Sequence, residues 1–119
     1  MNDKLKQIAD FYGLEIQVAK LAEECAEFSA AVFKHDYYEE LRHESSARFN
    51  LDLIGKKSIE AHEKMIEELA DVLLMARQVE YLLDGYLLNG YPSYRESVNR
   101  HMEVKVKRQL RRIAEEKAK

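Results

Sequence analysis

The sequence predicts an all-α protein, an antiparallel bundle of three long helices with one or two short ones, completed by oligomerisation. Three observations favour this class. One proline and four glycines occur in 119 residues, so few positions break a helix. Hydrophobic residues make up 46% of the chain and charged residues 34%, a balance typical of folded globular proteins. Apolar residues recur at helical spacing through three long segments.

The length and charge of the chain narrow its class further. A chain of 119 residues predicts a single domain over residues 1–119. The net charge of −3 gives no overall attraction for nucleic acid. The single cysteine, Cys25, cannot form an internal disulfide, which favours the cytoplasm. The sequence contains neither the apolar core of a signal peptide nor an apolar run long enough to span a membrane. Together with the net charge, this predicts a protein that binds neither nucleic acid nor a membrane.

The first half of the chain predicts a short helix and then a long one. Asn2 or Asp3 is expected to cap the short helix, which ends near Gly13. The following apolar residues recur every three or four positions and predict a helix of about 20 residues: Leu14, Val18, Leu21, Cys25, Phe28 and Val32. The segment from Asp36 to Ser58 is less regular, and we expect a short helix and a loop there.

The second half predicts two more long helices. Ser58 is expected to cap the next helix, which ends at Gly85. Residues 85–94 contain Gly, Asn and Pro and predict a turn. Ser93 is then expected to cap a final helix that runs to about Glu116. The apolar residues of the first of these two helices fall broadly on one side: Ile59, Met65, Ile66, Leu69, Val72, Leu73, Ala76, Val79 and Leu83.

An acidic motif occurs twice, as KLAEECAEF in residues 20–28 and as KMIEELADV in residues 64–72. Helical residues three apart lie on one face, so Glu24 neighbours Glu27, and Glu68 neighbours Asp71, each pair beside an apolar stripe. If the two helices pack through these stripes, four carboxylates converge and repel one another. A hard divalent cation would relieve that repulsion, and Mg²⁺ or Mn²⁺ fits the oxygen donors.

The final helix adds a basic segment, NRHMEVKVKRQLRRI. Lys105, Arg108 and Arg112 are spaced three and four apart and share a face. Arg and Lys side chains bind phosphate oxygens. A cation site together with this basic face favours a polyphosphate ligand. Taken alone, basic residues near a helix C-terminus also suit a solvated surface.

The order of these blocks resembles the MazG-like, all-α nucleoside triphosphate pyrophosphohydrolases, a superfamily that includes MazG proteins, dimeric dUTPases and phosphoribosyl-ATP pyrophosphohydrolases. Their E-E-x-x-E motif is matched at Glu23 to Glu27, their E-x-x-D motif at Glu68 to Asp71, and their basic ending by KVKRQLRRI. The resemblance implies hydrolysis of a (d)NTP or related nucleotide to the monophosphate and pyrophosphate. It also implies a homodimer or homotetramer, and residues 36–57 are interpreted as an insertion.

The resemblance also implies roles for single residues. Glu23 would orient or deprotonate the attacking water. The phosphates would be contacted by Lys105, Arg108 and Arg112. The Mg²⁺ ligands would be the four acids of the two motifs, Glu24, Glu27, Glu68 and Asp71.

Two other classes of protein share some of these features. A non-enzymatic helical module for protein interaction, with its acids merely solvated, is the main alternative. Lys20 with Glu24 and Lys64 with Glu68 are i,i+4 pairs that support any helix. A di-iron carboxylate bundle is disfavoured because it needs Glu-x-x-His twice, and this spacing occurs only at Glu40 and His43.

Overall fold

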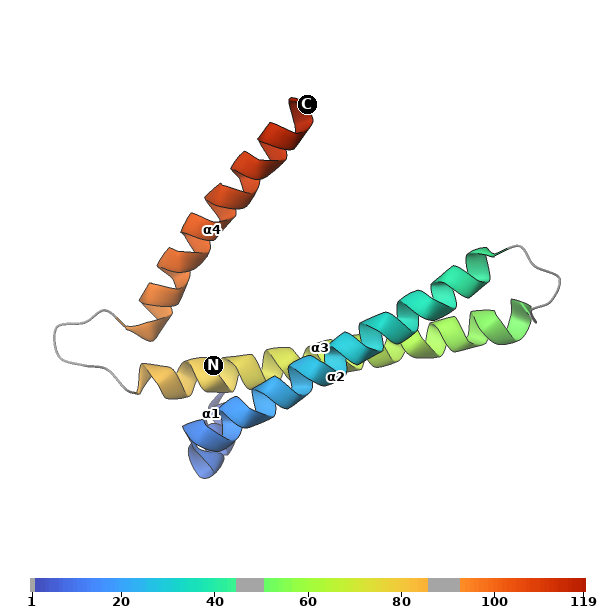
Figure 1. Ribbon diagram of the computed structural model, residues 1–119. Coiled ribbons are helices and arrows are strands. Elements are labelled where there is room, and N and C mark those ends of the chain that lie inside the picture. The colour runs from blue at the N-terminus through green and yellow to red at the C-terminus, as the bar shows by residue number, and fades with distance from the viewer. Residues whose placement is uncertain (1, 45–50, 86–92) are drawn as a thin grey trace. The chain divides into compact units, whose positions relative to one another are not determined.

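The computed structural model describes residues 2–44, 51–85 and 93–119. These residues form four helices and no strand, which confirms the all-α class (Figure 1). The chain divides into two compact units, residues 1–79 and residues 80–119, and each is described by itself. None of the helices among the described residues has the length and apolar character needed to cross a membrane. The helices are α1 (Asp3–Tyr12), α2 (Leu14–His43), α3 (Leu51–Asp84) and α4 (Tyr94–Lys117).

Short-range signals set several of the helix boundaries. The Asn2 side chain accepts a hydrogen bond from the Lys4 backbone N–H at 2.8 Å and caps α1. Gly13, with φ of 83°, separates α1 from α2, a backbone conformation that glycine adopts without steric cost. Ser93 caps α4 by accepting from the Glu96 N–H at 3.1 Å. These boundaries were predicted, as was the end of α3 beside Gly85.

The prediction for the segment from Asp36 to Ser58 is right in one part and wrong in another: residues 36–43 are helical, as expected, whereas the loop expected before Ser58 is helix from Leu51 onward. Residues 36–43 complete a 30-residue α2, and α3 already begins at Leu51, so the N-cap predicted at Ser58 is wrong too. Ser58 instead lies buried inside α3 and donates its hydroxyl proton to Glu39 of α2. Residues 45–50 of the interpreted insertion at 36–57 lie outside the described residues. A polar pair, Glu39 with Ser58, therefore links the two helices in a region where the buried Ile54 also lies in the seam.

Helices α2 and α3 pack side by side in opposite directions (Figure 1). Gln17 donates a hydrogen bond to Gln78 at 2.7 Å, and Glu39 accepts one from Ser58. Later residues of α2 thus pair with earlier residues of α3, as antiparallel helices require. The buried and half-buried positions of this seam alternate by three and four, as in a coiled coil. On α2 they are Leu14, Gln17, Leu21, Glu24, Phe28, Ala31, His35 and Tyr38, and on α3 they are Ile54, Ser58, Ala61, Met65, Glu68, Val72, Met75, Val79 and Leu82. Gln78, which precedes Val79, is buried as well and contacts Gln17 across the seam.

The seam of α2 differs from the predicted stripe by one position in each heptad. Val18 and Cys25, predicted to be inside, are exposed, Val18 to 46%. Gln17 and Glu24 are buried in their place. The predicted and observed registers share Leu14, Leu21 and Phe28, which lie seven residues apart. Which residues between them are buried depends on the side chains of α3 across the seam. This shift moves a motif glutamate from beside the stripe into the seam itself.

Candidate metal centre

Three carboxylates from two helices meet in the α2–α3 seam. Glu24 and Glu68 are buried, with only 7% and 5% of their surfaces exposed, and Asp71 is half-buried one turn beyond Glu68. One ligand atom from each of the three lies within 4.8 Å of the others. The antiparallel packing brings equivalent positions of the two motif copies together. The convergence predicted from the doubled motif is therefore present for these three acids.

Each buried glutamate is held by a lysine on only one of its oxygens. Lys20 Nζ lies 3.3 Å from Glu24 Oε1, and Lys64 Nζ lies 2.8 Å from Glu68 Oε1. Hydrogen bonds to these glutamates are the largest cause raising the pKa of each lysine. The Oε2 atoms of both glutamates are buried and find no hydrogen-bond partner among the described residues. Buried unsatisfied oxygens are costly, so a cation would supply the contact that both lack.

The other two motif acids of α2 lie nearer to solvent. Glu27 is exposed and does not belong to the group of three. The charge of Glu24 is the largest cause raising the pKa of Glu27, followed by desolvation, and Glu68 adds a smaller repulsion. Glu27 is therefore within electrostatic reach of the buried acids. Glu23 is exposed, with its carboxylate 3.6 Å from Lys20 Nζ.

The donor set suits a hard divalent cation. All three groups offer carboxylate oxygens, the ligands preferred by Mg²⁺ and Mn²⁺. Three protein ligands leave coordination positions for water or a substrate oxygen. Among the residues that the structure describes, this is the one group of three or more acids, histidines or cysteines close enough to share an ion.

The predicted phosphate contacts lie in the second unit. Lys105, Arg108 and Arg112 are exposed on α4, where their spacing places them on one side of the helix. Within the same unit, Arg95 Nε binds Glu80 at 2.9 Å, which joins the start of α4 to the end of α3. The role of the three basic residues in binding phosphate remains a prediction.

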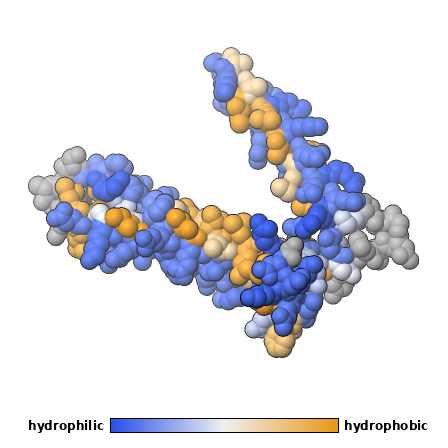
Figure 2. Space-filling model, turned by 180° about the vertical axis from the view of Figure 1, so that it is seen from behind, coloured by the Kyte–Doolittle hydropathy of each residue, from blue (hydrophilic) through white to orange (hydrophobic). Residues whose placement is uncertain are grey.

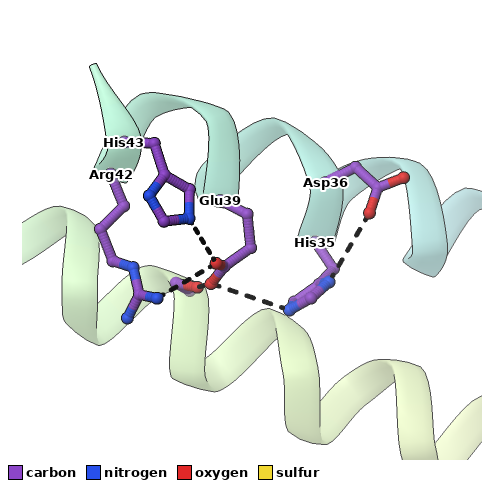
Figure 3. Close-up of polar contacts among 6 residues, drawn as sticks. His35, Asp36, Glu39, Arg42 and His43 are labelled. Atoms are coloured by element: carbon purple, nitrogen blue, oxygen red, sulfur yellow. Dashed lines mark hydrogen bonds and ion pairs between the residues drawn. The ribbon is translucent and has the colours of Figure 1, made fainter.

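A second polar cluster, around Glu39, was not found by the sequence reasoning (Figure 3). Ser58 of α3 donates to the Glu39 carboxylate, and this hydrogen bond is the largest cause lowering the pKa of Glu39. Arg42 Nη2 lies 3.2 Å from the same carboxylate. Because Ser58 and Arg42 both contact its carboxylate, Glu39 has its hydrogen-bond partners within the protein. We therefore interpret the cluster as a structural contact that holds α2 against α3. The other contacts are His43 Nε2 to Glu39 at 3.6 Å, His35 Nε2 to Glu39 at 3.9 Å and His35 Nδ1 to Asp36 at 3.8 Å.

A contrast between the two clusters shows which one lacks a partner. The Glu39 carboxylate has donors for both of its oxygens, whereas Glu24 and Glu68 each keep one buried oxygen without any.

The chain matches no protein-family model, and neither a curated protein nor a solved structure matches it. The interpretation of the site therefore depends on its own residues.

Proposed function

We propose that this chain is a Mg²⁺-dependent nucleotide pyrophosphohydrolase of the cytoplasm, cleaving a (d)NTP or related nucleotide to the monophosphate and pyrophosphate. One observation carries the proposal: the buried Oε2 atoms of Glu24 and Glu68 lack partners, and Asp71 completes a group of three acids. The order of the acidic and basic motifs, which resembles the MazG-like enzymes, supports the choice of reaction. Mn²⁺ would fit the same donors.

In this proposal the acids of the two motifs hold the cation. Glu24, Glu68 and Asp71 are the ligands, and Glu27, which lies within electrostatic reach of them, is the fourth. When bound, the cation would neutralise charge on the phosphate oxygens and lower the pKa of a water molecule bound to it. Lys20 and Lys64 keep one oxygen of each buried glutamate occupied, so each glutamate offers its other oxygen to the cation.

The remaining roles belong to groups at the solvent side. Glu23 precedes a ligand in the sequence and is exposed, so its carboxylate is available to accept the proton of the attacking water. Lys105, Arg108 and Arg112 would contact the phosphates and stabilise the charge of the departing pyrophosphate. Their exposed side chains and shared face are compatible with that task.

A nucleotide panel with Mg²⁺ tests the reaction through the release of pyrophosphate. We expect release by the wild type and a loss of at least about 100-fold in Glu24→Gln. Glu23→Gln should lose about 100-fold or more in turnover while it still binds Mn²⁺ in calorimetry. Glu67→Gln is the matched control, because Glu67 is exposed and touches Lys64 at 3.6 Å but lies outside the cluster. Pyrophosphate release that survives in Glu24→Gln would overturn the proposal.

A non-enzymatic interaction module is the second candidate. It is favoured by large apolar side chains that α3 exposes, among them Ile59, Ile66 and Leu73. Such a module needs no cation, so a wild type without saturable binding of Mg²⁺ or Mn²⁺ in calorimetry would support it over the enzyme.

A further inference from the structure

Each lysine of the two acidic motifs contacts one oxygen of a buried glutamate. Lys20 Nζ lies 3.3 Å from Glu24 Oε1, and Lys64 Nζ lies 2.8 Å from Glu68 Oε1. The lysines belong to different helices, α2 and α3, yet both make the same i,i+4 contact. The antiparallel packing thus builds one arrangement twice, and the effect of each lysine on its glutamate is the same in kind.

The two lysines reach these glutamates from the surface. The side chains of Lys20 and Lys64 are 46% and 56% exposed, whereas those of Glu24 and Glu68 are 9% and 7% exposed. A lysine can lay its apolar stem along a protein surface and keep its ammonium group in water. Figure 2 shows hydrophilic side chains beside apolar ones along the surface of the molecule. The ammonium groups therefore lie at the solvent edge of the seam.

The two oxygens of each buried glutamate are in different situations. Both Oε1 atoms are engaged by ammonium groups, and hydrogen bonds to these glutamates are the largest cause raising the pKa of both lysines. Both Oε2 atoms are buried and have no hydrogen-bond partner among the described residues. An ammonium group donates hydrogen bonds and repels a cation. Each glutamate therefore offers one oxygen, and not two, to an ion in the metal centre.

One oxygen from each carboxylate suits a small ion better than a large one. Mg²⁺ requires near-octahedral geometry and keeps several water ligands. Ca²⁺ takes about six to eight oxygen ligands and often binds both oxygens of one carboxylate. The metal centre has few protein donors, so a large ion has the most to gain from the second oxygen of each glutamate. Blocking that oxygen therefore disfavours Ca²⁺ more than Mg²⁺ or Mn²⁺.

We propose that Lys20 and Lys64 determine the specificity of the metal centre: they block the second oxygen of each buried glutamate, so that the site selects Mg²⁺ or Mn²⁺ over Ca²⁺. The proposal rests on the cation site of the proposed function and is independent of the reaction. It gives the lysines a task beyond the i,i+4 pairing that supports any helix. Lys64 makes the shorter contact, so its loss should have the larger effect.

Lys57 provides a matched control on the same helix. It lies seven residues before Lys64 and so occupies nearly the same side of α3, about two turns away. It is 49% exposed and lies 3.9 Å from the exposed Glu60, whereas the residue four positions after it is Ala61. Lys57→Met thus removes the same charge from the same helix without freeing an oxygen of the metal centre.

Calorimetric titration of the full chain with Mn²⁺, Mg²⁺ and Ca²⁺, without nucleotide, tests the proposal. The readout is the Kd for Ca²⁺ divided by the Kd for Mn²⁺. Removing a positive charge strengthens the binding of both ions alike, whereas freeing an oxygen favours Ca²⁺. We expect this ratio to fall about tenfold in Lys64→Met and by a smaller factor in Lys20→Met. Lys64→Arg, which keeps a charged donor, and Lys57→Met should keep the ratio of the wild type.

The outcomes separate this proposal from the reaction. Far-UV circular dichroism establishes that the variants keep their helices, and Lys20→Met tests the proposal independently if Lys64→Met does not fold. A ratio unchanged in the folded variants overturns the proposal, as does an equal fall in Lys57→Met, because charge alone would then explain it. A ratio that falls as expected supports the proposal even if no nucleotide is cleaved, and then the reaction alone is refuted. A wild type that binds none of the three ions refutes both.

Discussion

Replacing Glu68 by glutamine removes one buried charge from the metal centre and keeps the shape of the side chain. Glu68 faces Glu24 and Asp71 with ligand atoms within 4.8 Å. Two unit charges at that separation repel by about 3.5 kcal/mol at an effective dielectric constant of 20. The contact with Lys64 is lost, but this lysine is half-exposed, so its loss costs about 1 kcal/mol or less. Without a cation, we expect the free energy of unfolding of Glu68→Gln to be roughly 2–4 kcal/mol higher than that of the wild type.

A divalent cation should remove most of that difference in stability. At a free concentration of 100 times its Kd, a cation that binds only the folded protein raises the free energy of unfolding by about 2.7 kcal/mol. The variant lacks a ligand and should gain little. Chemical denaturation, followed by circular dichroism in EDTA and in Mn²⁺, measures both quantities. Glu67→Gln, which changes an exposed acid beside the same lysine, should stay within about 0.5 kcal/mol of the wild type and keep the response to the cation.

Two results would refute this reasoning. If Glu68→Gln is less stable than the wild type in EDTA, the Glu68 carboxylate is already well satisfied and the site needs no cation. If the variant gains as much stability from Mn²⁺ as the wild type does, the cation binds elsewhere.

Three further predictions concern polar groups in the seam and beside it. Gln78→Leu leaves the buried Gln17 amide without its partner and should cost about 1–3 kcal/mol in chemical denaturation; the double variant with Gln17→Leu should recover most of it, and additive losses would argue against the pair. The pKa of Glu39 is lowered from 4.5, chiefly by the hydrogen bond from Ser58, so Glu39 contributes stability above pH 4.5 that is lost as the pH falls through its lowered pKa. Denaturation midpoints below pH 4.5 should therefore fall less steeply in Ser58→Ala, and an unchanged slope would contradict this. The pKa of Glu27 is raised, chiefly by the charge of Glu24, so cation binding near that pKa should release a proton; calorimetry in two buffers should show no such release in Glu27→Gln, and equal release in both proteins would exclude Glu27 as its source.

Local signals in the sequence predicted the helices and several of their ends. Asn2, Gly13, Gly85 and Ser93 act on their own turn of the backbone, so their effect depends on neighbours in the sequence. The scarcity of proline and glycine predicted long helices in the same way. These features could be predicted because the interactions that decide them span only a few residues.

The register of the seam could not be predicted from hydrophobicity. Apolar character favours Val18 and Cys25 as inside positions, yet Gln17 and Glu24 are buried there. The amide of Gln17 is satisfied by Gln78, 61 residues away. A polar residue becomes an acceptable seam residue only when its partner on the other helix is known.

The same limit explains the errors between Asp36 and Ser58. Glu39 and Ser58 pair across the hairpin, and no local pattern marks that pair. The doubled acidic motif was informative for the opposite reason: two equal copies on two helices predict that they meet, and Glu24, Glu68 and Asp71 do meet. What the pattern did not show is the burial of two of these acids within the seam.

The antiparallel course of α2 and α3 makes the two motif copies nearly interchangeable. Residues 20–28 and residues 64–72 supply the same lysine and the same buried glutamate from opposite directions. A homodimer of one peptide carrying either copy, aligned head to tail, would place two such glutamates face to face without any connecting loop. The centre of the hairpin thus has an approximate two-fold symmetry, which is broken where the half-buried Asp71 and the exposed Glu27 occupy equivalent positions.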